Sequence, residues 1–134
     1  MTGQLQQTIT KALDKYSCIQ AAYLFGSRVR GREKKKSDLD LAVVSTQNIS
    51  GWERIEMETD LSNQIGVDVD LVIFHQANPL LQHQILKHGR LIMEKSRPER
   101  IRQETWARYE YLDTRHLHKE LGDLMYKMIV EGLL

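Results

Sequence analysis

The chain has 134 residues, of which 41% are hydrophobic and 28% charged, and its net charge at pH 7 is +1. These values are ordinary for one globular domain and give no reason to expect direct nucleic-acid binding. The sequence begins without a signal-peptide pattern and lacks any apolar run of the ~18 residues that span a bilayer, so we expect a cytoplasmic protein without a membrane partner.

The first half of the chain alternates predicted helices and strands. Apolar residues spaced three and four apart predict an amphipathic helix over residues 4–16, and the apolar run at 19–25 predicts a buried strand. We expect a short helix over residues 27–32 and an exposed loop over 34–37. A second strand is predicted over residues 38–44, so the order is helix, strand, short helix and strand.

The second half of the chain ends in a long predicted helix. Elements follow in the order helix, strand, helix, short edge strand and long helix, over residues 52–65, 67–74, 79–88, 90–93 and 98–130. This alternation predicts an α/β fold with a small mixed β-sheet flanked by helices. We expect one domain over residues 1–134, with residues 98–134 as a C-terminal helical segment.

Apolar residues mark two of the predicted helices. The helix over residues 52–65 is predicted from Trp52, Ile55, Leu61 and Ile65, and Gly66 ends it. For the C-terminal helix we expect a stripe mostly in the core, consisting of Trp106, Tyr109, Leu112, Leu117, Leu121, Leu124 and Met128. One small sheet cannot cover so long a helix, so the last apolar residues either face solvent or meet a partner or a second copy, namely Met125, Met128, Ile129, Leu133 and Leu134.

Three aspartates stand in strand-forming runs, where a charge is costly unless a positive group lies beside it. Asp38 and Asp40 are separated by one residue, so on a strand both point to the same face, and Asp70 lies on the next predicted strand. Neighbouring carboxylates repel, and a divalent cation is the simplest reason to hold them together. Gly26 and Ser27 form a turn whose N–H groups and hydroxyl suit phosphate oxygens.

Each of these features alone has an ordinary interpretation: a strand-ending turn, a helix cap with a surface acid, or an acid paired with an arginine. Their joint occurrence predicts a metal-dependent nucleotide site. Asp68 shares a face with Asp70, and from spacing alone either is the third carboxylate. For Asp68 we expect a capping or pairing role.

Other polar residues are less specific. The segment from Arg28 to Lys36 carries six basic residues and one acid, Glu33, and three interpretations remain open: phosphate neutralisation, a solvated loop or RNA contact. We expect structural or surface roles for the five histidines. The one cysteine, Cys18, excludes an intramolecular disulfide and a cysteine-based zinc cluster, and we expect it in the core.

The run from Gly26-Ser27 through ten residues to Asp38-Leu39-Asp40, with Asp70-Leu71-Val72 further along, resembles the signature of the minimal nucleotidyltransferases of the DNA polymerase β superfamily. The resemblance continues weakly through residues 89–93 and 109–113. Among these proteins the chain resembles the antitoxins of HEPN–MNT toxin–antitoxin pairs, in which the MNT protein transfers AMP to a HEPN ribonuclease. The basic residues 34–36 depart from the family, whose members often carry acids or proline there.

The resemblance implies a two-metal mechanism. Asp38 and Asp40 are expected to hold Mg²⁺ against the triphosphate of ATP. Asp70 is expected to complete a second metal position, or to orient and deprotonate the acceptor hydroxyl. ATP as the nucleotide comes from the resemblance alone.

The phosphates are expected to meet the turn that precedes these aspartates. Gly26 and Ser27 would bind the β- and γ-phosphates, and Arg28 and Arg30 are candidates for neutralising pyrophosphate as it leaves. The expected partner is a cognate HEPN toxin, met through the C-terminal helix in a homo- or hetero-oligomer. Two alternatives stay open: a non-enzymatic antitoxin that occludes its toxin, and nucleotide transfer to a small hydroxylated molecule.

Overall fold

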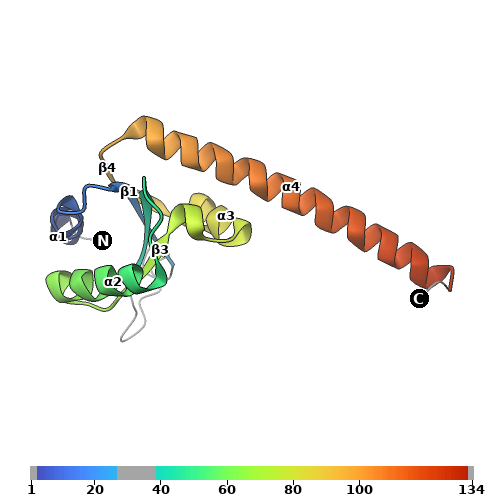
Figure 1. Cartoon of the computed structure of the whole chain (residues 1–134), viewed down its shortest axis with the longest axis horizontal. Coiled ribbons are helices and arrows are strands. Elements are labelled where there is room, and N and C mark those ends of the chain that lie inside the picture. The colour runs from blue at the N-terminus through green and yellow to red at the C-terminus, as the bar shows by residue number, and fades with distance from the viewer. Residues whose placement is uncertain (1–2, 27–38, 133–134) are drawn as a thin grey trace.

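The computed structural model describes residues 3–26 and 39–132, and in them four strands form one mixed sheet (Figure 1). The strands are β1 (Ile19–Phe25), β2 (Leu39–Ser45), β3 (Val69–Ile73) and β4 (Arg90–Glu94). They lie in the order β3-β2-β1-β4, with β2 and β3 parallel and the other neighbours antiparallel. The predicted mixed sheet is confirmed, and β4 is an edge strand as expected.

Helices cover both faces of this sheet (Figure 1). One face packs against α1 (Gly3–Asp14) and α2 (Gly51–Ile65), and the other against α3 (Pro79–His88) and the first turns of α4 (Arg97–Val130). A short 3₁₀ helix, η1 (Phe74–Gln76), shortens the strand that we predicted to run to residue 74. Each of α2, α3 and α4 begins after a residue whose side-chain oxygen accepts a backbone N–H bond three residues later, namely Ser50, Asn78 and Ser96.

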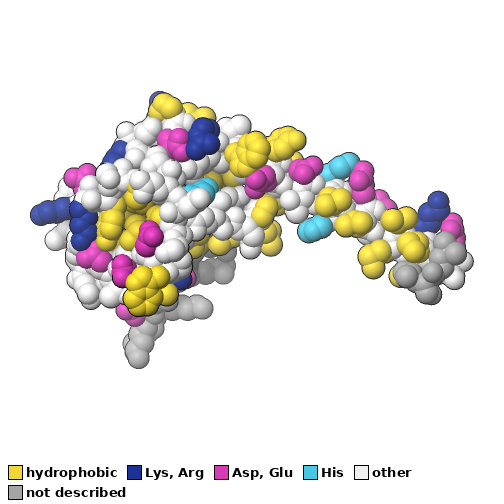
Figure 2. Space-filling view, in the orientation of Figure 1, with side chains coloured by type: hydrophobic (Ala, Val, Ile, Leu, Met, Phe, Trp, Pro, Cys, Tyr) yellow, Lys and Arg dark blue, Asp and Glu magenta, His cyan; other side chains and the backbone are white. Residues whose placement is uncertain are grey.

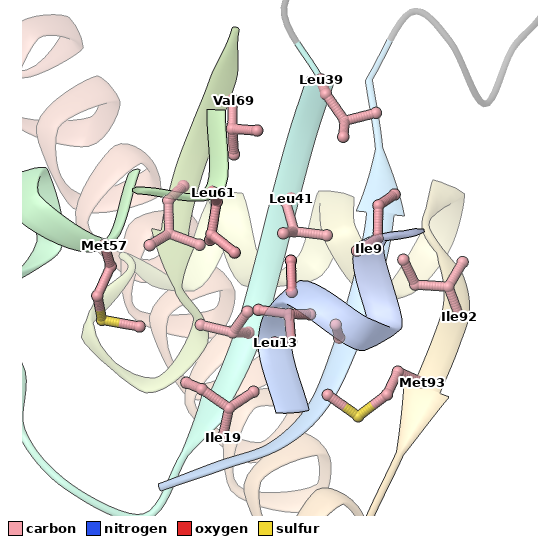
Figure 3. Close-up of a cluster of buried hydrophobic side chains, with 14 of the residues drawn as sticks. Ile9, Leu13, Ile19, Leu39, Leu41, Met57, Leu61, Val69, Ile92 and Met93 are labelled. Carbon is pink, nitrogen blue, oxygen red and sulfur yellow. The ribbon is translucent and has the colours of Figure 1, made fainter. Parts of the chain in front are cut away.

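The larger core lies between the sheet and the pair α1 and α2 (Figure 3). Ile9 and Leu13 of α1 meet Leu41 of β2 and Leu61 of α2 there, and all four are fully buried. A smaller cluster on the opposite face joins the sheet to α3 and α4, and its buried members are Ala21, Tyr23, Ala42, Val44, Phe74, Ile85 and Ala107. Cys18 is only partly buried, at the margin of the larger core.

Alternation along β2 decides where its aspartate points. Leu39 and Leu41 belong to the core under α1 and α2, whereas Ala42 belongs to the cluster under α3 and α4. Successive strand residues face opposite sides, so Asp40 lies on the α3 and α4 face. The same alternation in β3 puts Asp70 on that face, because Leu71 is in the larger core.

The predicted helix α2 is confirmed, but two of the apolar residues that predicted it lie on the surface. Trp52 is 71% exposed and Ile55 46% exposed, and the buried residues of α2 are Met57 and Leu61. The helix turns polar side chains toward the edge strand β3 instead. Backbone N–H groups of β3 donate to these side chains, that of Val69 to Ser62 Oγ and that of Leu71 to Glu58 Oε2, each at 2.9 Å. This pairing covers an otherwise open sheet edge.

The expected core role of the α4 stripe is wrong for most of its length. Its buried residues are Gln103, Glu104 and Ala107, whereas the stripe from Trp106 to Leu124 is between 47% and 64% exposed at its large apolar positions. The helix crosses the sheet with its first turns and then continues beyond it (Figure 1). Apolar side chains therefore remain on the surface of its distal part (Figure 2).

The first turns of α4 are tied to the sheet through Glu104. The Tyr23 hydroxyl of β1 donates to its carboxylate, and Arg100 and Arg108 donate to it at 2.6 and 3.3 Å. Arg100 also bonds Glu94 of β4 at 2.6 Å. None of the described helices is long and apolar enough to cross a membrane.

Candidate active site

Two of the predicted site carboxylates lie side by side on neighbouring strands. Asp40 of β2 and Asp70 of β3 are direct partners in the parallel register, and both point to the α3 and α4 face. Paired strands are about 4.8 Å apart, so the two side chains leave the sheet as neighbours. Asp40 is partly buried and Asp70 is exposed, which leaves the pair open to solvent on one side.

Gly26 lies directly against this pair. It follows Phe25, the β1 partner of Asp40, and has a φ of 83°, which a residue with a side chain rarely adopts. A Cβ added to Gly26 would lie 2.0 Å from Asp40 Oδ2 and 2.9 Å from Asp40 Cγ. Glycine therefore gives the Asp40 carboxylate room over the turn, a role beyond the phosphate approach expected from the sequence.

The electrostatics of the pair favour a bound cation. Like charges at directly paired strand positions destabilise a sheet, so their juxtaposition has a cost in the isolated chain. Asp70 makes no ion pair or side-chain hydrogen bond with any other described residue. Carboxylate oxygens are the ligands that Mg²⁺ prefers, and two of them here share one face and one strand register.

The remaining predicted site residues fall outside the described part of the chain. These are Ser27, Arg28, Arg30 and Asp38, together with the basic segment 28–36. Within residues 3–26 and 39–132, no three carboxylate, imidazole or thiol groups gather into a set that holds a metal. The described residues thus provide two carboxylates and the glycine of the expected site.

Asp68 lies one pleat before Asp70 and on the same side of the chain. Its backbone carbonyl accepts from the Leu39 N–H at 2.8 Å, which continues the pairing of β2 and β3 by one step. We expected the Asp68 side chain to cap a helix or form an ion pair, but it makes neither contact with any described residue. Asp68 and Asp70 both line a depression beside α2, so the structure places the two candidate third carboxylates together.

A cationic groove between α3 and α4 escaped the sequence reasoning. His83 and Tyr111 stack with ring centroids 3.8 Å apart and planes 5° apart, beside Lys87, Arg108 and Arg115, in a groove of about 350 Å³. α3 leads into β4, whose Arg90 pairs with Leu24 near the Gly26 end of β1. The available signal was the spacing of the basic residues, four positions between His83 and Lys87 and seven between Arg108 and Arg115, which puts each pair on one helix face.

Comparison with known proteins agrees with this geometry. The family described as polymerase beta, nucleotidyltransferase matches residues 7–98. The protein adenylyltransferase MntA of Shewanella oneidensis is 32% identical over 77 residues, which are 58% of this chain and 55% of that relative. The chain therefore matches about half the length of this curated relative.

Solved structures show the same fold over most of the chain. A crystal structure of a toxin–antitoxin with AMP-PNP has a TM-score of 0.74 at 26% identity, covering 92% of this chain and 98% of that one. A structure of a tri-AMPylated Shewanella oneidensis HEPN toxin in complex with MNT antitoxin has a TM-score of 0.72 at 24% identity, covering 96% and 99%. The second likeness supports the fold alone.

Proposed function

This chain belongs to the polymerase β nucleotidyltransferase family, and from that premise we propose that it transfers AMP from ATP to a hydroxyl of a partner protein. The observation that carries the proposal is the placement of Asp40 and Asp70 as register partners on one face, with Gly26 against Asp40. The similarity to a protein adenylyltransferase and to a toxin–antitoxin structure with AMP-PNP supports it.

Magnesium fits the donor set of this site. Asp40 and Asp70 would hold it together with Asp38, the third aspartate of the signature. When bound, Mg²⁺ neutralises phosphate charge and stabilises the attacking and leaving oxygens of an in-line displacement.

The protein groups have separate tasks in the proposed transfer. The acceptor hydroxyl oxygen forms a bond to the α-phosphorus as the bond from that phosphorus to the bridging oxygen of the β-phosphate breaks, so pyrophosphate leaves. Asp70, the more exposed carboxylate, orients the acceptor and takes its proton. Gly26 and Ser27 bind the β- and γ-phosphates, while Arg28 and Arg30 offset the charge of the departing pyrophosphate.

We assign the partner-docking surface to the distal part of α4. Leu117, Leu121 and Leu124 follow one another at spacings of four and three, and each is about half exposed. Met125 and Ile129 extend this apolar surface to the end of the helix (Figure 2). Apolar surfaces of this extent mark protein interfaces. A HEPN-type toxin, which would offer its own hydroxyl as acceptor, is the proposed occupant.

Mass spectrometry tests the transfer directly. Incubating the chain with its cognate HEPN protein, ATP and Mg²⁺ should add about 329 Da per AMP unit to that protein through the displacement described above. Asp40→Asn should add nothing, while Glu56→Gln, an exposed acid of α2, should act like wild type as a matched control. Full transfer by Asp40→Asn would reject the assigned site.

Occlusion of the toxin is the second candidate, and the exposed apolar surface of α4 favours it. Dose dependence separates the two functions. An enzyme neutralises many toxin molecules per copy, whereas an occluding protein needs one copy for each toxin. If wild type and Asp40→Asn both neutralise the toxin equally well, and only at one copy for each toxin, the transfer proposal fails and occlusion holds. Loss of neutralisation at every dose by Leu121→Asp alone would assign docking to α4 without deciding the chemistry.

A further inference from the structure

The groove between α3 and α4 carries positive charge that the described fold leaves without a partner. Its volume is about 350 Å³, and its basic residues are His83, Lys87, Arg108 and Arg115. Among the described residues, no carboxylate lines it. Arg108 donates to Glu104 at 3.3 Å, but Lys87 and Arg115 make no ion pair with a described residue. Two cationic side chains therefore line the groove without a negative partner.

These cations are open to solvent and stand beside apolar surface. Lys87, Arg108 and Arg115 are all exposed, so a ligand can reach them. The apolar residues that line the groove with them are Leu86, Ala107 and Leu112. The groove therefore suits a ligand that carries both negative charge and apolar side chains.

The spacing of the cations suits an extended ligand. Arg108 and Arg115 are seven residues apart on α4, which is two helical turns and about 10 Å along the helix axis. Lys87 lines the same groove from α3, which lies beneath α4 (Figure 1). Cations that are spread out in this way match several carboxylates along a peptide better than they match a single phosphate group.

The aromatic pair in the groove favours a peptide over a nucleic acid. His83 and Tyr111 stack on each other, with ring centroids 3.8 Å apart and planes 5° apart, and both are partly buried. Proteins that bind single-stranded nucleic acid present aromatic faces on which bases stack. Here each ring already uses one face on the other ring, and the stack joins α3 to α4.

The Lys87 end of the groove lies toward the proposed transfer site. Lys87 comes three residues before Arg90, which pairs with Leu24 near the end of β1. Leu86, which lines the groove, packs against the same cluster as Phe25, the last residue of β1. The groove is therefore on the side of the sheet that carries the aspartates.

We propose that this groove binds an acidic segment of the acceptor protein, with carboxylates on Lys87 and Arg115 and aliphatic side chains on the apolar lining. Binding there holds the acceptor on the side of the sheet where its hydroxyl is needed. Opposite charges also speed the encounter of two proteins. The role in transfer rests on the proposed function, whereas the binding itself needs neither ATP nor transfer.

Peptide binding tests the groove without any transfer. The probe is a capped, fluorescently labelled nonapeptide of three Glu-Glu-Leu repeats, and the matched peptide has Gln in place of every Glu. In fluorescence anisotropy at low salt, the acidic peptide should bind about tenfold more tightly, the worth of two exposed ion pairs. The ring NMR signals of His83 and Tyr111 should shift as it binds. Equal affinity of the two peptides, or unshifted rings, would overturn the proposal.

Variants locate the peptide. Lys87→Gln and Arg115→Gln should each weaken binding of the acidic peptide by a factor of about two to five, and the double variant by about tenfold. Both side chains are exposed, so these changes leave the packing in place. Lys11→Gln is the matched control, an exposed lysine of α1 on the other face of the sheet, and should bind as wild type does. Unchanged affinity in the double variant, or an equal loss in Lys11→Gln, would reject the groove as the site.

Two further probes distinguish an acidic segment from other anions. AMP represents a nucleotide, and hexauridylate represents single-stranded RNA. Each should displace the labelled peptide less effectively than the unlabelled acidic peptide does. If either displaces it more effectively, that ligand is the occupant and the proposal is overturned.

Kinetics connect the groove to transfer. With the acceptor protein as substrate, the double variant Lys87→Gln and Arg115→Gln should raise KM for the acceptor by about tenfold. It should leave kcat and KM for ATP unchanged, because the lost interaction is uniform binding of the acceptor. A raised KM for ATP instead would assign the groove to the nucleotide and overturn the proposal.

Peptide binding also separates this inference from the proposed function. Asp40→Asn should lose transfer and still bind the acidic peptide as wild type does. If wild type binds the peptide but transfers no AMP, the proposed function fails while the groove stands as a site for acidic peptides. If wild type transfers AMP but does not bind the peptide, the groove proposal fails and the proposed function stands.

Discussion

Glu104 and the pair Asp40 and Asp70 are carboxylates on the same side of one sheet, yet their surroundings differ. Glu104 is 8% exposed and receives hydrogen bonds from Tyr23, Arg100 and Arg108. Asp40 and Asp70 are more open, and each has another carboxylate as its register partner. The fold surrounds Glu104 with hydrogen-bond donors, whereas Asp70 has no such donor among the described residues and is open to a cation from outside.

This difference separates structural from functional acids. A buried carboxylate that contributes to stability needs donors within the fold, because an uncompensated charge there is costly. Like charges at paired strand positions lower stability, and a bound cation offsets their repulsion. The substitutions below should therefore have opposite effects on activity and stability in the two places.

The largest expected effect is on transfer activity. Asp40→Asn removes a proposed metal ligand and should abolish AMP transfer. Asp70→Asn should lower the transfer rate by a factor of about 10² to 10⁴, the range for a positioned proton acceptor. Quantitative transfer of labelled AMP to the partner protein measures it. Asp68→Asn is the matched control one pleat away and should cost far less. The reverse ranking would identify Asp68 as the third carboxylate.

A large loss of stability should follow when Glu104 is removed. Glu104→Ala leaves Arg100 and the Tyr23 hydroxyl without their shared acceptor and should lower the free energy of unfolding by about 3 kcal/mol. Urea unfolding measures this, and the transfer rate per folded molecule should stay near that of wild type. The milder change Tyr23→Phe removes one hydrogen bond and should cost about 1 kcal/mol. Unchanged stability in both would refute a structural role for the cluster.

The stability of the fold should decrease at acid pH, because hydrogen bonds within it lower the pKa of two carboxylates. Burial raises the pKa of Glu104, but the bonds from Tyr23 and Arg100 outweigh this and hold the pKa below its ordinary value. Hydrogen bonds from Lys15 and Tyr16 lower the pKa of Asp60 from 3.8 to about 2. A carboxylate with a lowered folded pKa stabilises above its unfolded pKa, so stability should fall from about pH 4.5 toward pH 2.

The stability of the fold should also decrease at alkaline pH. Burial and the bond to Glu104 raise the pKa of Tyr23 above its ordinary value of 10. The folded state favours the protonated phenol, so this contribution is present below pH 10 and is lost as pH rises beyond it. Thermal melts at several pH values measure both limits, and Tyr23→Phe should weaken the alkaline loss. An unchanged alkaline loss in that variant would assign it to another group.

Local patterns were sufficient to predict most elements. β1 is an apolar run that ends before a glycine, and α3 begins with Asn78-Pro79, a typical helix start. The shared face of Asp40 and Asp70 followed from strand alternation once both strands were known to be parallel neighbours. Residues 27–38, which carry half of the motif, lie outside the described structure.

Features that depend on distant pairing could not be predicted. Tyr23 and Glu104 are 81 positions apart, and nothing local to either indicates their bond. The stripe of α4 has the spacing of a buried face, yet the sheet ends before the helix does, so periodicity could not distinguish core from interface. The side of α2 that faces β3 is polar, because its side chains accept hydrogen bonds from the backbone of this edge strand. The spacing of apolar residues gives no sign of such bonds.

The smallest expected effect has the sign opposite to that of Glu104→Ala. Asp70→Asn removes one of two like charges at paired strand positions and should raise the free energy of unfolding by a few tenths of a kcal/mol. The gain should shrink in 1 M salt, because the pair is open to solvent and its repulsion is screened. Mg²⁺ should stabilise wild type more than Asp70→Asn and so reduce the difference between them. Urea unfolding with and without Mg²⁺ measures this, with Glu56→Gln as an exposed-acid control. A loss of stability on Asp70→Asn would mean that Asp70, like Glu104, supports the fold, and the contrast between the two places would then fail.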